Sequence, residues 1–121
     1  MDARSGQGFP SSCRLRTSRD YTQVWRNGRR FHTAHLLVIV CSGGAAVPRL
    51  GLSVSRKVGN AVCRNRIKRR IREFFRRRRG AIDQAVDLSI VVKTGAGAID
   101  HASLARELQE AFVRLQVCRD A

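Results

Sequence analysis

The stretch AVCRNRIKRRIREFFRRRR, residues 61–79, constrains the fold more than any other part of this chain. It carries ten basic side chains and a single acid, Glu73. Its apolar residues follow the spacing i, i+4, i+8, i+11 and i+12, at Cys63, Ile67, Ile71, Phe74 and Phe75. This spacing predicts a helix from Ala61 to Arg79 with one face in the core and the other faces charged. Because a disordered basic tail would lack such a stripe, we expect the cations to be held on a fixed scaffold.

The chain as a whole is strongly basic. Its 121 residues include 24 Lys and Arg against nine Asp and Glu, a formal net charge of +15, and 43% of them are hydrophobic. This composition predicts one small domain with a core, whose self-repulsion a polyanionic partner would relieve. The narrow apolar stripe favours nucleic acid, since a helix lying on a membrane needs a broad apolar face. No run approaches the ~18 apolar residues of a transmembrane span, so we expect a soluble protein with no membrane partner.

Hydrophobic patterns elsewhere predict further elements in the order α, β, β, α, β, α. Ser18 is expected to cap a short helix that ends at Asn27, before Gly28. The apolar run from His35 to Cys41 and the alternating segment 50–54 predict two strands, joined by a turn over residues 42–48. Residues 30–33 could add a short extra strand. Together these patterns predict an α+β fold around one sheet.

After the basic helix stops at Gly80, the segment Asp87 to Lys93 predicts another strand. A Gly-rich loop over residues 94–99 follows it. Asp100 is expected to cap a last helix. One side of that helix would be apolar and is made by Leu104, Leu108, Ala111, Phe112 and Leu115.

Residues 1–13 read as a flexible tail, because they contain Gly, Ser and Pro and lack the apolar region of a signal peptide. We therefore expect a cytoplasmic protein whose cysteines are reduced. The four cysteines are scattered, and the three histidines lack ligand spacing. No protein-bound metal or other cofactor is predicted from this pattern.

Three segments resemble one known family. The segment RLGLSVSRKVGNAVCRNRIKRRIRE, from Arg49 to Glu73, is similar to the signature of the bacterial ribonuclease P protein subunit. The likeness continues upstream in RLRTSRDYTQVWRNGRR, residues 14–30, and downstream in DLSIVVKTGAGAID, residues 87–100. It implies a single domain over residues 14–121, a small α/β sandwich of the ribosomal protein S5 domain 2-like type. It also implies a left-handed β-α-β crossover, whereas the general handedness rule would favour a right-handed one for parallel neighbours.

The resemblance also implies a function. Members of this family bind the catalytic RNA of ribonuclease P and the 5′ leader of precursor tRNA, and the RNA cleaves the phosphodiester with bound Mg²⁺. No catalytic residue and no obligate protein partner are then expected in this chain. The residues agree with the expected lack of a catalytic residue. Metal-dependent hydrolysis usually needs clustered carboxylates, whereas this chain has only nine acids, of which Asp83 and Asp87 come closest to a cluster. A general RNA-binding, ribosome-associated protein and an autonomous nuclease remain the alternatives.

The basic helix and the residues before it are the expected contacts to the catalytic RNA. Guanidinium groups can form paired hydrogen bonds with phosphates, and such contacts should make binding steeply salt-dependent. The alternative for any charged run is a solvated face. Asn65 could bond a base edge or ribose, or the backbone, and Asn60 could also cap the helix. The predicted residues are Arg56, Lys57, Asn60, Arg64, Asn65, Arg66, Lys68, Arg69 and Arg72.

Tyr21 and Trp25 lie four residues apart, on one face of the first helix. Aromatic residues at that spacing are usually core. Under the resemblance they match an aromatic pair that lines the leader-binding cleft, where stacking on unpaired bases tolerates many sequences. Some relatives have a further aromatic in the next strand, where this chain has aliphatic residues near Val38–Val40. The cleft is therefore expected to depend also on cations such as Arg14 and Lys93.

Overall fold

The computed structural model describes residues 14–15, 17–42, 47–82 and 85–117. The predicted N-terminal tail and most of the predicted 42–48 turn lie outside these residues. The helices are α2 (Ser18–Asn27), α3 (Ala61–Arg78) and α4 (His101–Arg114). The strands are β1 (Arg29–His32), β2 (Leu36–Ser42), β3 (Arg49–Val54) and β4 (Val86–Val92). Short 3₁₀ turns lie at η2 (Arg56–Val58), η3 (Arg79–Ala81) and η4 (Thr94–Ala98).

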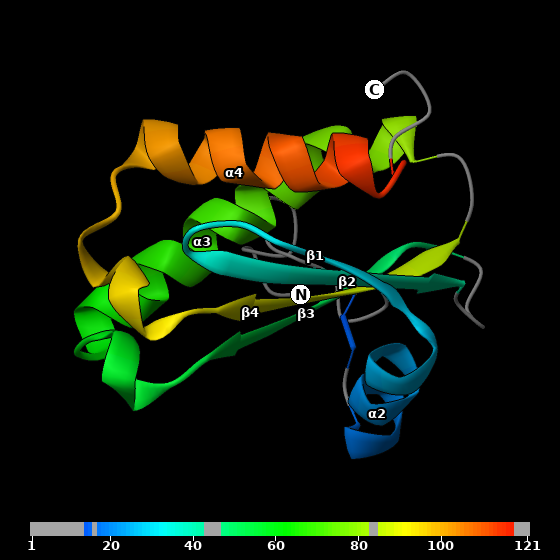
Figure 1. The fold of residues 1–121 in the computed structure, drawn as a ribbon, viewed down its shortest axis with the longest axis horizontal. Coiled ribbons are helices and arrows are strands. Elements are labelled where there is room, and N and C mark those ends of the chain that lie inside the picture. The colour runs from blue at the N-terminus through cyan, green and yellow to red at the C-terminus, as the bar shows by residue number, and fades with distance from the viewer. Residues whose placement is uncertain (1–13, 16, 43–46, 83–84, 118–121) are drawn as a thin grey trace, which may run out of the picture.

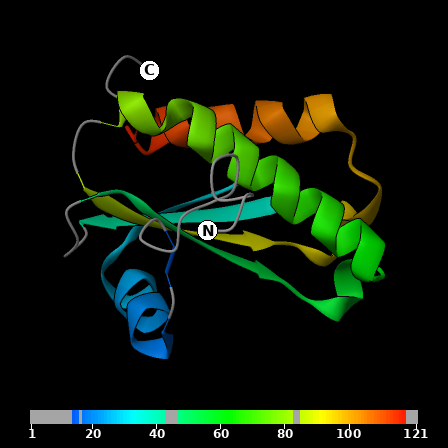
Figure 2. The same ribbon diagram turned by 180° about the vertical axis from the view of Figure 1, so that it is seen from behind.

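The four strands form one mixed sheet in the order β1-β2-β4-β3. β1 pairs with β2 and β2 with β4 in antiparallel fashion, whereas β3 runs parallel to β4. Helices α3 and α4 cover one face of this sheet and α2 covers part of the other (Figures 1 and 2). Because β2 and β4 are central and covered on both faces, nearly all their residues are buried, which explains their continuous apolar runs. The predicted α+β fold is confirmed.

The connection between the parallel neighbours β3 and β4 passes through α3. In Figure 1 the chain follows β3 at the back of the sheet, rises into α3 above it and returns along β4 nearer the viewer. That path is a left-handed β-α-β crossover. Most such connections are right-handed. The prediction of a left-handed crossover therefore depended on the family resemblance and not on a general physical rule.

The larger core lies between the sheet and helices α3 and α4. The predicted stripe is confirmed, since Ile67, Ile71, Phe74 and Phe75 are buried and Cys63 packs against the same cluster. The predicted apolar side of α4 is buried as well, at Leu104, Leu108, Ala111 and Phe112, and Leu115 is buried just after the helix. A smaller cluster of Leu15, Val24, Leu37 and Ile39 lies under α2. The faces of α3 that point away from the core therefore carry its charge.

Several predicted boundaries need correction. The N-cap of α2 is Thr17 and not Ser18, because the Thr17 hydroxyl accepts from the Asp20 N–H at 3.1 Å while the Asp20 carboxylate accepts from the Thr17 N–H at 3.3 Å. This reciprocal capping box places the N-cap one residue earlier than predicted, while the helix itself spans the predicted residues Ser18–Asn27. The predicted loop over residues 94–99 contains the 3₁₀ turn η4, and α3 ends at Arg78. The predicted cap at Asp100 is confirmed, with its carboxylate accepting from the Ser103 N–H at 2.7 Å.

The helices in the part of the chain that the structure describes include none that combines the length and apolar character needed to cross a membrane.

Candidate nucleic-acid interface

Helix α3 presents its cations from a start that is fixed by Asn60. The Asn60 side-chain oxygen accepts a hydrogen bond from the Cys63 N–H at 2.9 Å, which makes Asn60 the N-cap. Arg56 and Lys57 are exposed in η2, directly before this cap. Asn65 and Arg69 are exposed on the helix itself. The structure therefore leaves Arg56, Lys57, Asn65 and Arg69 exposed before and along α3, and it gives Asn60 the capping role.

Arg64 and Arg66 hold neighbouring turns against α3. Arg64 Nε donates to the Gly59 carbonyl at 3.1 Å, and Arg66 Nη2 donates to the Gly97 carbonyl at 3.1 Å. The Cys63 thiol lies on the same carbonyl at 3.2 Å. Arg66 Nε is buried and has no hydrogen-bond partner among the described residues. These two arginines, predicted to contact RNA, therefore also join η2 and η4 to the helix.

A groove of about 400 Å³ lies where α2, β3 and α3 meet. It is lined by Arg14, Leu15, Tyr21, Leu50, Leu52, Lys68 and Arg72. Arg14 reaches it because its segment pairs with β3, forming a parallel bridge between Arg14 and Leu50, with the Leu15 N–H donating to the Leu50 carbonyl at 3.0 Å. The groove thus joins residues that the sequence assigned to two different ligands, the leader and the catalytic RNA.

The electrostatics of the groove favour an anion. Burial of the Arg72 guanidinium lowers its pKa, and the like charge of Arg14 lowers it further, with a smaller opposing effect of Tyr21. Both causes reflect the cost of keeping the Arg72 cation in this place. A phosphate between the two side chains would offset that cost, since it carries the opposite charge and accepts from guanidinium groups.

Tyr21 lies directly over the sheet at Gly51. A Cβ atom at Gly51 would come within 2.6 Å of Tyr21 Cε1 and within 2.8 Å of Leu15 Cδ1. Only a residue without a side chain allows this approach. The glycine in the RLGLSV segment therefore sets the depth of the ring in the groove.

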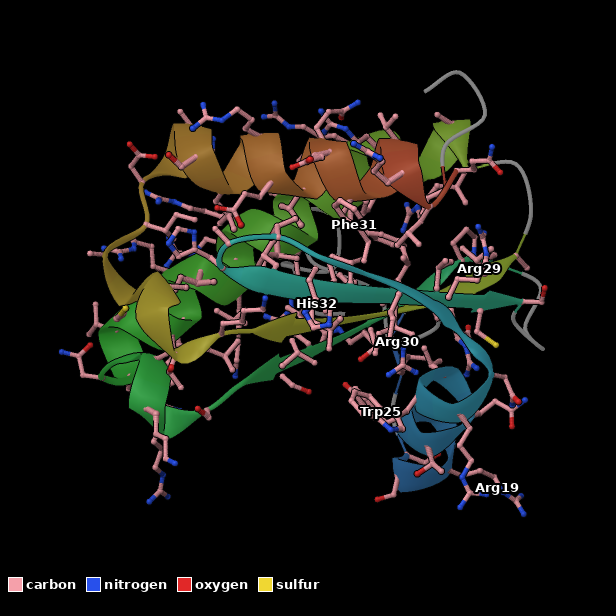
Figure 3. All side chains as sticks on the ribbon, viewed as in Figure 1. Arg19, Trp25, Arg29, Arg30, Phe31 and His32 are labelled. Carbon is pink, nitrogen blue, oxygen red and sulfur yellow. The ribbon has the colours of Figure 1, made fainter. Side chains whose placement is uncertain are left out.

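Trp25 lies on the same side of the sheet but is not among the residues that line the groove. Its side chain is 52% exposed, and the Arg30 guanidinium lies 4.5 Å from the ring centroid. Arg30 also donates to the Trp25 carbonyl. Figure 3 shows Arg30 and His32 on the side of α2, whereas Phe31 points toward α4. Sequence reasoning missed Arg30, although the alternation of β1 around the apolar Phe31 could have indicated it.

Lys93 directly follows the C-terminal end of β4. Val91 packs in the cluster under α2, so the alternation of side chains directs Lys93 to the same face. Its ammonium donates to the Thr33 carbonyl at 2.8 Å, in the turn between β1 and β2. Lys93 is therefore on the face of the sheet that α2 covers, but it does not line the groove that contains Arg14 and Tyr21.

Asp87, one of the two acids nearest to a cluster in the sequence, is engaged in an ion pair. Its carboxylate accepts from Arg49 Nε at 2.9 Å and from Arg49 Nη2 at 2.8 Å, and Asp20 lies 3.6 Å from the same guanidinium. Asp83 lies outside the described residues. Within residues 14–15, 17–42, 47–82 and 85–117, no three His, Cys, Asp or Glu side chains gather in a way that could hold a metal ion.

The chain is similar to known proteins over most of its length. A family model described as Ribonuclease P matches residues 9–116. The ribonuclease P protein component of Syntrophus aciditrophicus is 41% identical over 95 residues, covering 78% of this chain and 80% of that protein. The corresponding protein of Geobacter sp. (strain M21) is 39% identical over 112 residues, covering 93% and 96%.

Solved structures agree with these sequence matches. The RNase P protein of Staphylococcus aureus has a TM-score of 0.82 at 29% identity, with 88% of this chain and 98% of that chain covered. The RNase P protein of Thermotoga maritima has a TM-score of 0.70 at 30% identity, with 80% and 92% covered. The family model, the relatives and the shared fold together show that this chain belongs to the bacterial ribonuclease P protein component family, as the protein subunit of ribonuclease P in tRNA processing.

Proposed function

We propose that this chain, through residues 14–121 acting as one domain in the cytoplasm, binds the catalytic RNA of ribonuclease P and the 5′ leader of precursor tRNA. Binding of both promotes removal of the leader. The observation that carries the proposal is the groove in which Arg14 and Tyr21 meet Lys68 and Arg72. The surface for the catalytic RNA comprises Arg56, Lys57, Asn60, Arg64, Asn65, Arg66, Lys68, Arg69 and Arg72. The surface for the leader comprises Arg14, Tyr21, Trp25 and Lys93.

The two surfaces act by different physical means. The cations on α3 neutralise phosphates and release counterions, which supplies affinity without reading sequence. The exposed ring of Trp25 and the ring of Tyr21 offer flat faces on which unpaired bases can stack. Since every base has such a face, one protein can accept many different leaders. Magnesium, held and used by the RNA subunit, supplies the cleavage chemistry, and the residues of this chain bind and orient the RNA strands.

Replacing Arg69 with alanine is expected to weaken binding of the catalytic RNA mainly at low salt. Arg69 is exposed on α3, so its loss removes about one phosphate contact and should reduce the slope of log K against log salt by roughly 0.7 to 0.9. The dissociation constant is measured by filter binding over a series of salt concentrations.

Arg106→Ala is the matched control for this measurement, because Arg106 is an exposed cation on α4, where it bonds Ser103. The proposal expects the control slope to equal that of the parent protein. Equal reductions for both variants would show that the chain binds through its net charge, as a general RNA-binding protein would.

Replacing Tyr21 with alanine is expected to weaken binding of a leader-bearing precursor tRNA to the reconstituted enzyme by the ~1–3 kcal/mol of one stacked base. Affinity for the same tRNA without a leader should not change. The ratio of the two dissociation constants, measured for parent and variant, tests this expectation. Thr22→Ala, an exposed change on the same helix, serves as the control. A loss of equal size with and without the leader would place Tyr21 in the core and not in the leader site.

A further inference from the structure

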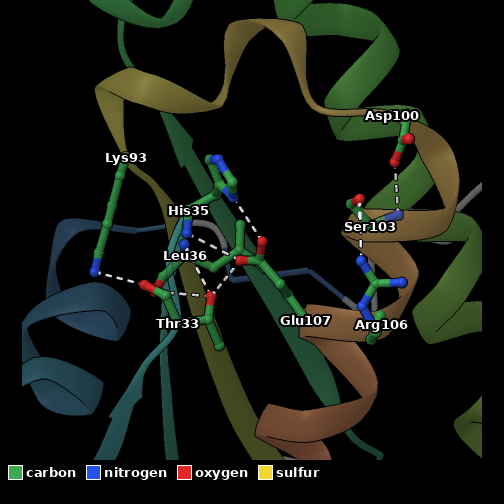
Figure 4. A network of polar contacts seen from close by, with 8 residues as sticks. All are labelled: Thr33, His35, Leu36, Lys93, Asp100, Ser103, Arg106 and Glu107. Atoms are coloured by element: carbon green, nitrogen blue, oxygen red, sulfur yellow. Dashed lines mark hydrogen bonds and ion pairs between the residues drawn. The ribbon is translucent and has the colours of Figure 1, made fainter.

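A network of polar contacts joins α4 to the turn between β1 and β2 (Figure 4). Glu107 of α4 accepts from the Thr33 hydroxyl at 2.5 Å and from the His35 N–H at 2.9 Å through the same carboxylate oxygen, Oε1. Its other oxygen, Oε2, lies 2.6 Å from His35 Nδ1. One carboxylate therefore holds three groups of a turn that is 72 to 74 residues away in the sequence.

The network is suited to a charged carboxylate. Burial alone raises the pKa of Glu107, but the hydrogen bonds from Thr33 and His35 outweigh burial and bring this pKa below its ordinary value. Glu107 is thus ionised at neutral pH and can only accept hydrogen bonds, so His35 Nδ1 carries the proton in this contact. Charge-assisted bonds of this kind are stronger than neutral ones, and they restrict the turn to one geometry.

The same turn holds Lys93 from the other side. The Thr33 carbonyl accepts from the Lys93 ammonium at 2.8 Å, and the Lys93 N–H donates to the His35 carbonyl at 2.9 Å. In Figure 4 the side chains of Lys93 and Glu107 approach the turn from opposite directions. An ammonium has three donors, and Thr33 takes one of them, which leaves the others for a ligand on the face of α2.

We propose that Glu107 is a positioning residue, which fixes the β1–β2 turn so that Lys93 presents its ammonium to the 5′ leader on the opposite face of the sheet. The inference rests on the proposed leader-binding function. It adds a residue of α4, a helix that no expected RNA contact involves, to the determinants of leader binding. Glu107 touches no substrate in this scheme and acts through Thr33 and Lys93.

The test uses the complete enzyme, reconstituted from this chain and ribonuclease P RNA. Dissociation constants are measured before cleavage for a precursor tRNA with a leader and for the same tRNA without one. Lys93→Ala is expected to weaken binding of the leader-bearing form by roughly tenfold, and Glu107→Ala by roughly threefold. Binding of the leaderless form should not change in either variant.

Three further measurements separate positioning from a loss of stability. Glu107→Gln keeps an oxygen that can accept from the Thr33 hydroxyl and the His35 N–H, and its amide N–H can donate to His35 Nδ1 in the other ring tautomer, so it should restore leader binding to within about twofold of the parent. Glu110→Ala removes the same charge from an exposed site on α4 and should have no effect. The double variant Lys93→Ala with Glu107→Ala should be no weaker than Lys93→Ala alone, because the two residues act in one path.

Hydrogen exchange of the His35 amide, which donates to Glu107, reports the turn independently of function. Faster exchange in Glu107→Ala, together with the selective loss of leader binding, supports the inference. Additive losses in the double variant, or unchanged leader binding despite faster exchange, would overturn it while leaving the proposed function intact. If Lys93→Ala itself leaves leader binding unchanged, the proposed role of Lys93 fails, and the role of Glu107 fails with it.

Discussion

Replacing Phe75 with alanine is expected to lower the free energy of unfolding by about 3–5 kcal/mol. Phe75 is fully buried in the core between α3 and the sheet, and truncation would leave a cavity beneath the helix that carries the cations. Small domains are stable by only about 5–15 kcal/mol, so this one change should remove a large part of the total. Chemical denaturation followed by circular dichroism measures it.

Val62→Ala is the control for this prediction. Val62 is an apolar residue on the same helix, but 77% of it is exposed, so its truncation should change stability by less than about 0.5 kcal/mol. Similar losses for both variants would mean that the stripe at Phe75 is not the surface on which α3 packs. The packing assigned to the helix that carries the cations would then be wrong.

Replacing Asp87 with alanine is expected to cost about 3 kcal/mol of stability, the lower end for breaking a buried ion pair. Asp87 is 3% exposed and forms both hydrogen bonds to the Arg49 guanidinium, whose pKa these bonds raise. Without Asp87, the acid nearest to the Arg49 cation among the described residues is the more distant Asp20, at 3.6 Å. The pair joins the first residue of β3 to the second residue of β4, and Asp20 links it to α2, so its loss should also change the shape of the groove.

Asp87→Asn tests the same contact with less change in shape. The amide keeps one acceptor for Arg49, and the loss of stability should fall between those of the parent and of Asp87→Ala. If thermal unfolding of Asp87→Ala matches that of the parent, the ion pair does not hold these strands together.

Local patterns in the sequence were sufficient to predict most elements. The stripe from Cys63 to Phe75 identified α3 and its buried face, and Asp100 marked the start of α4, because capping and 3.6-residue periodicity are local properties. The N-cap of α2 was placed one residue late, since Thr17 and Ser18 both carry a hydroxyl and only the bond to Asp20 distinguishes them.

The arrangement of the candidate site depends on contacts between distant segments, which periodicity cannot predict. Arg14 enters the groove because its segment pairs with β3, and Gly51 matters because the Tyr21 ring packs against it. Arg66 looked like a free phosphate ligand in the sequence, yet its guanidinium bonds the Gly97 carbonyl 31 residues away. The left-handed crossover runs against the usual preference and required the resemblance.

The most direct test of the account is single-turnover cleavage of a precursor tRNA at low magnesium by bacterial ribonuclease P RNA. The reaction is measured with the RNA alone, with this chain added, with a variant in which Lys68, Arg69 and Arg72 are glutamine, and with the protein alone. We predict that the parent chain stimulates cleavage only when the RNA is present, and that the variant loses most of this stimulation. Binding without stimulation, full stimulation by the variant, or cleavage by the protein alone would contradict the assignment of α3 and the groove as the working RNA surface.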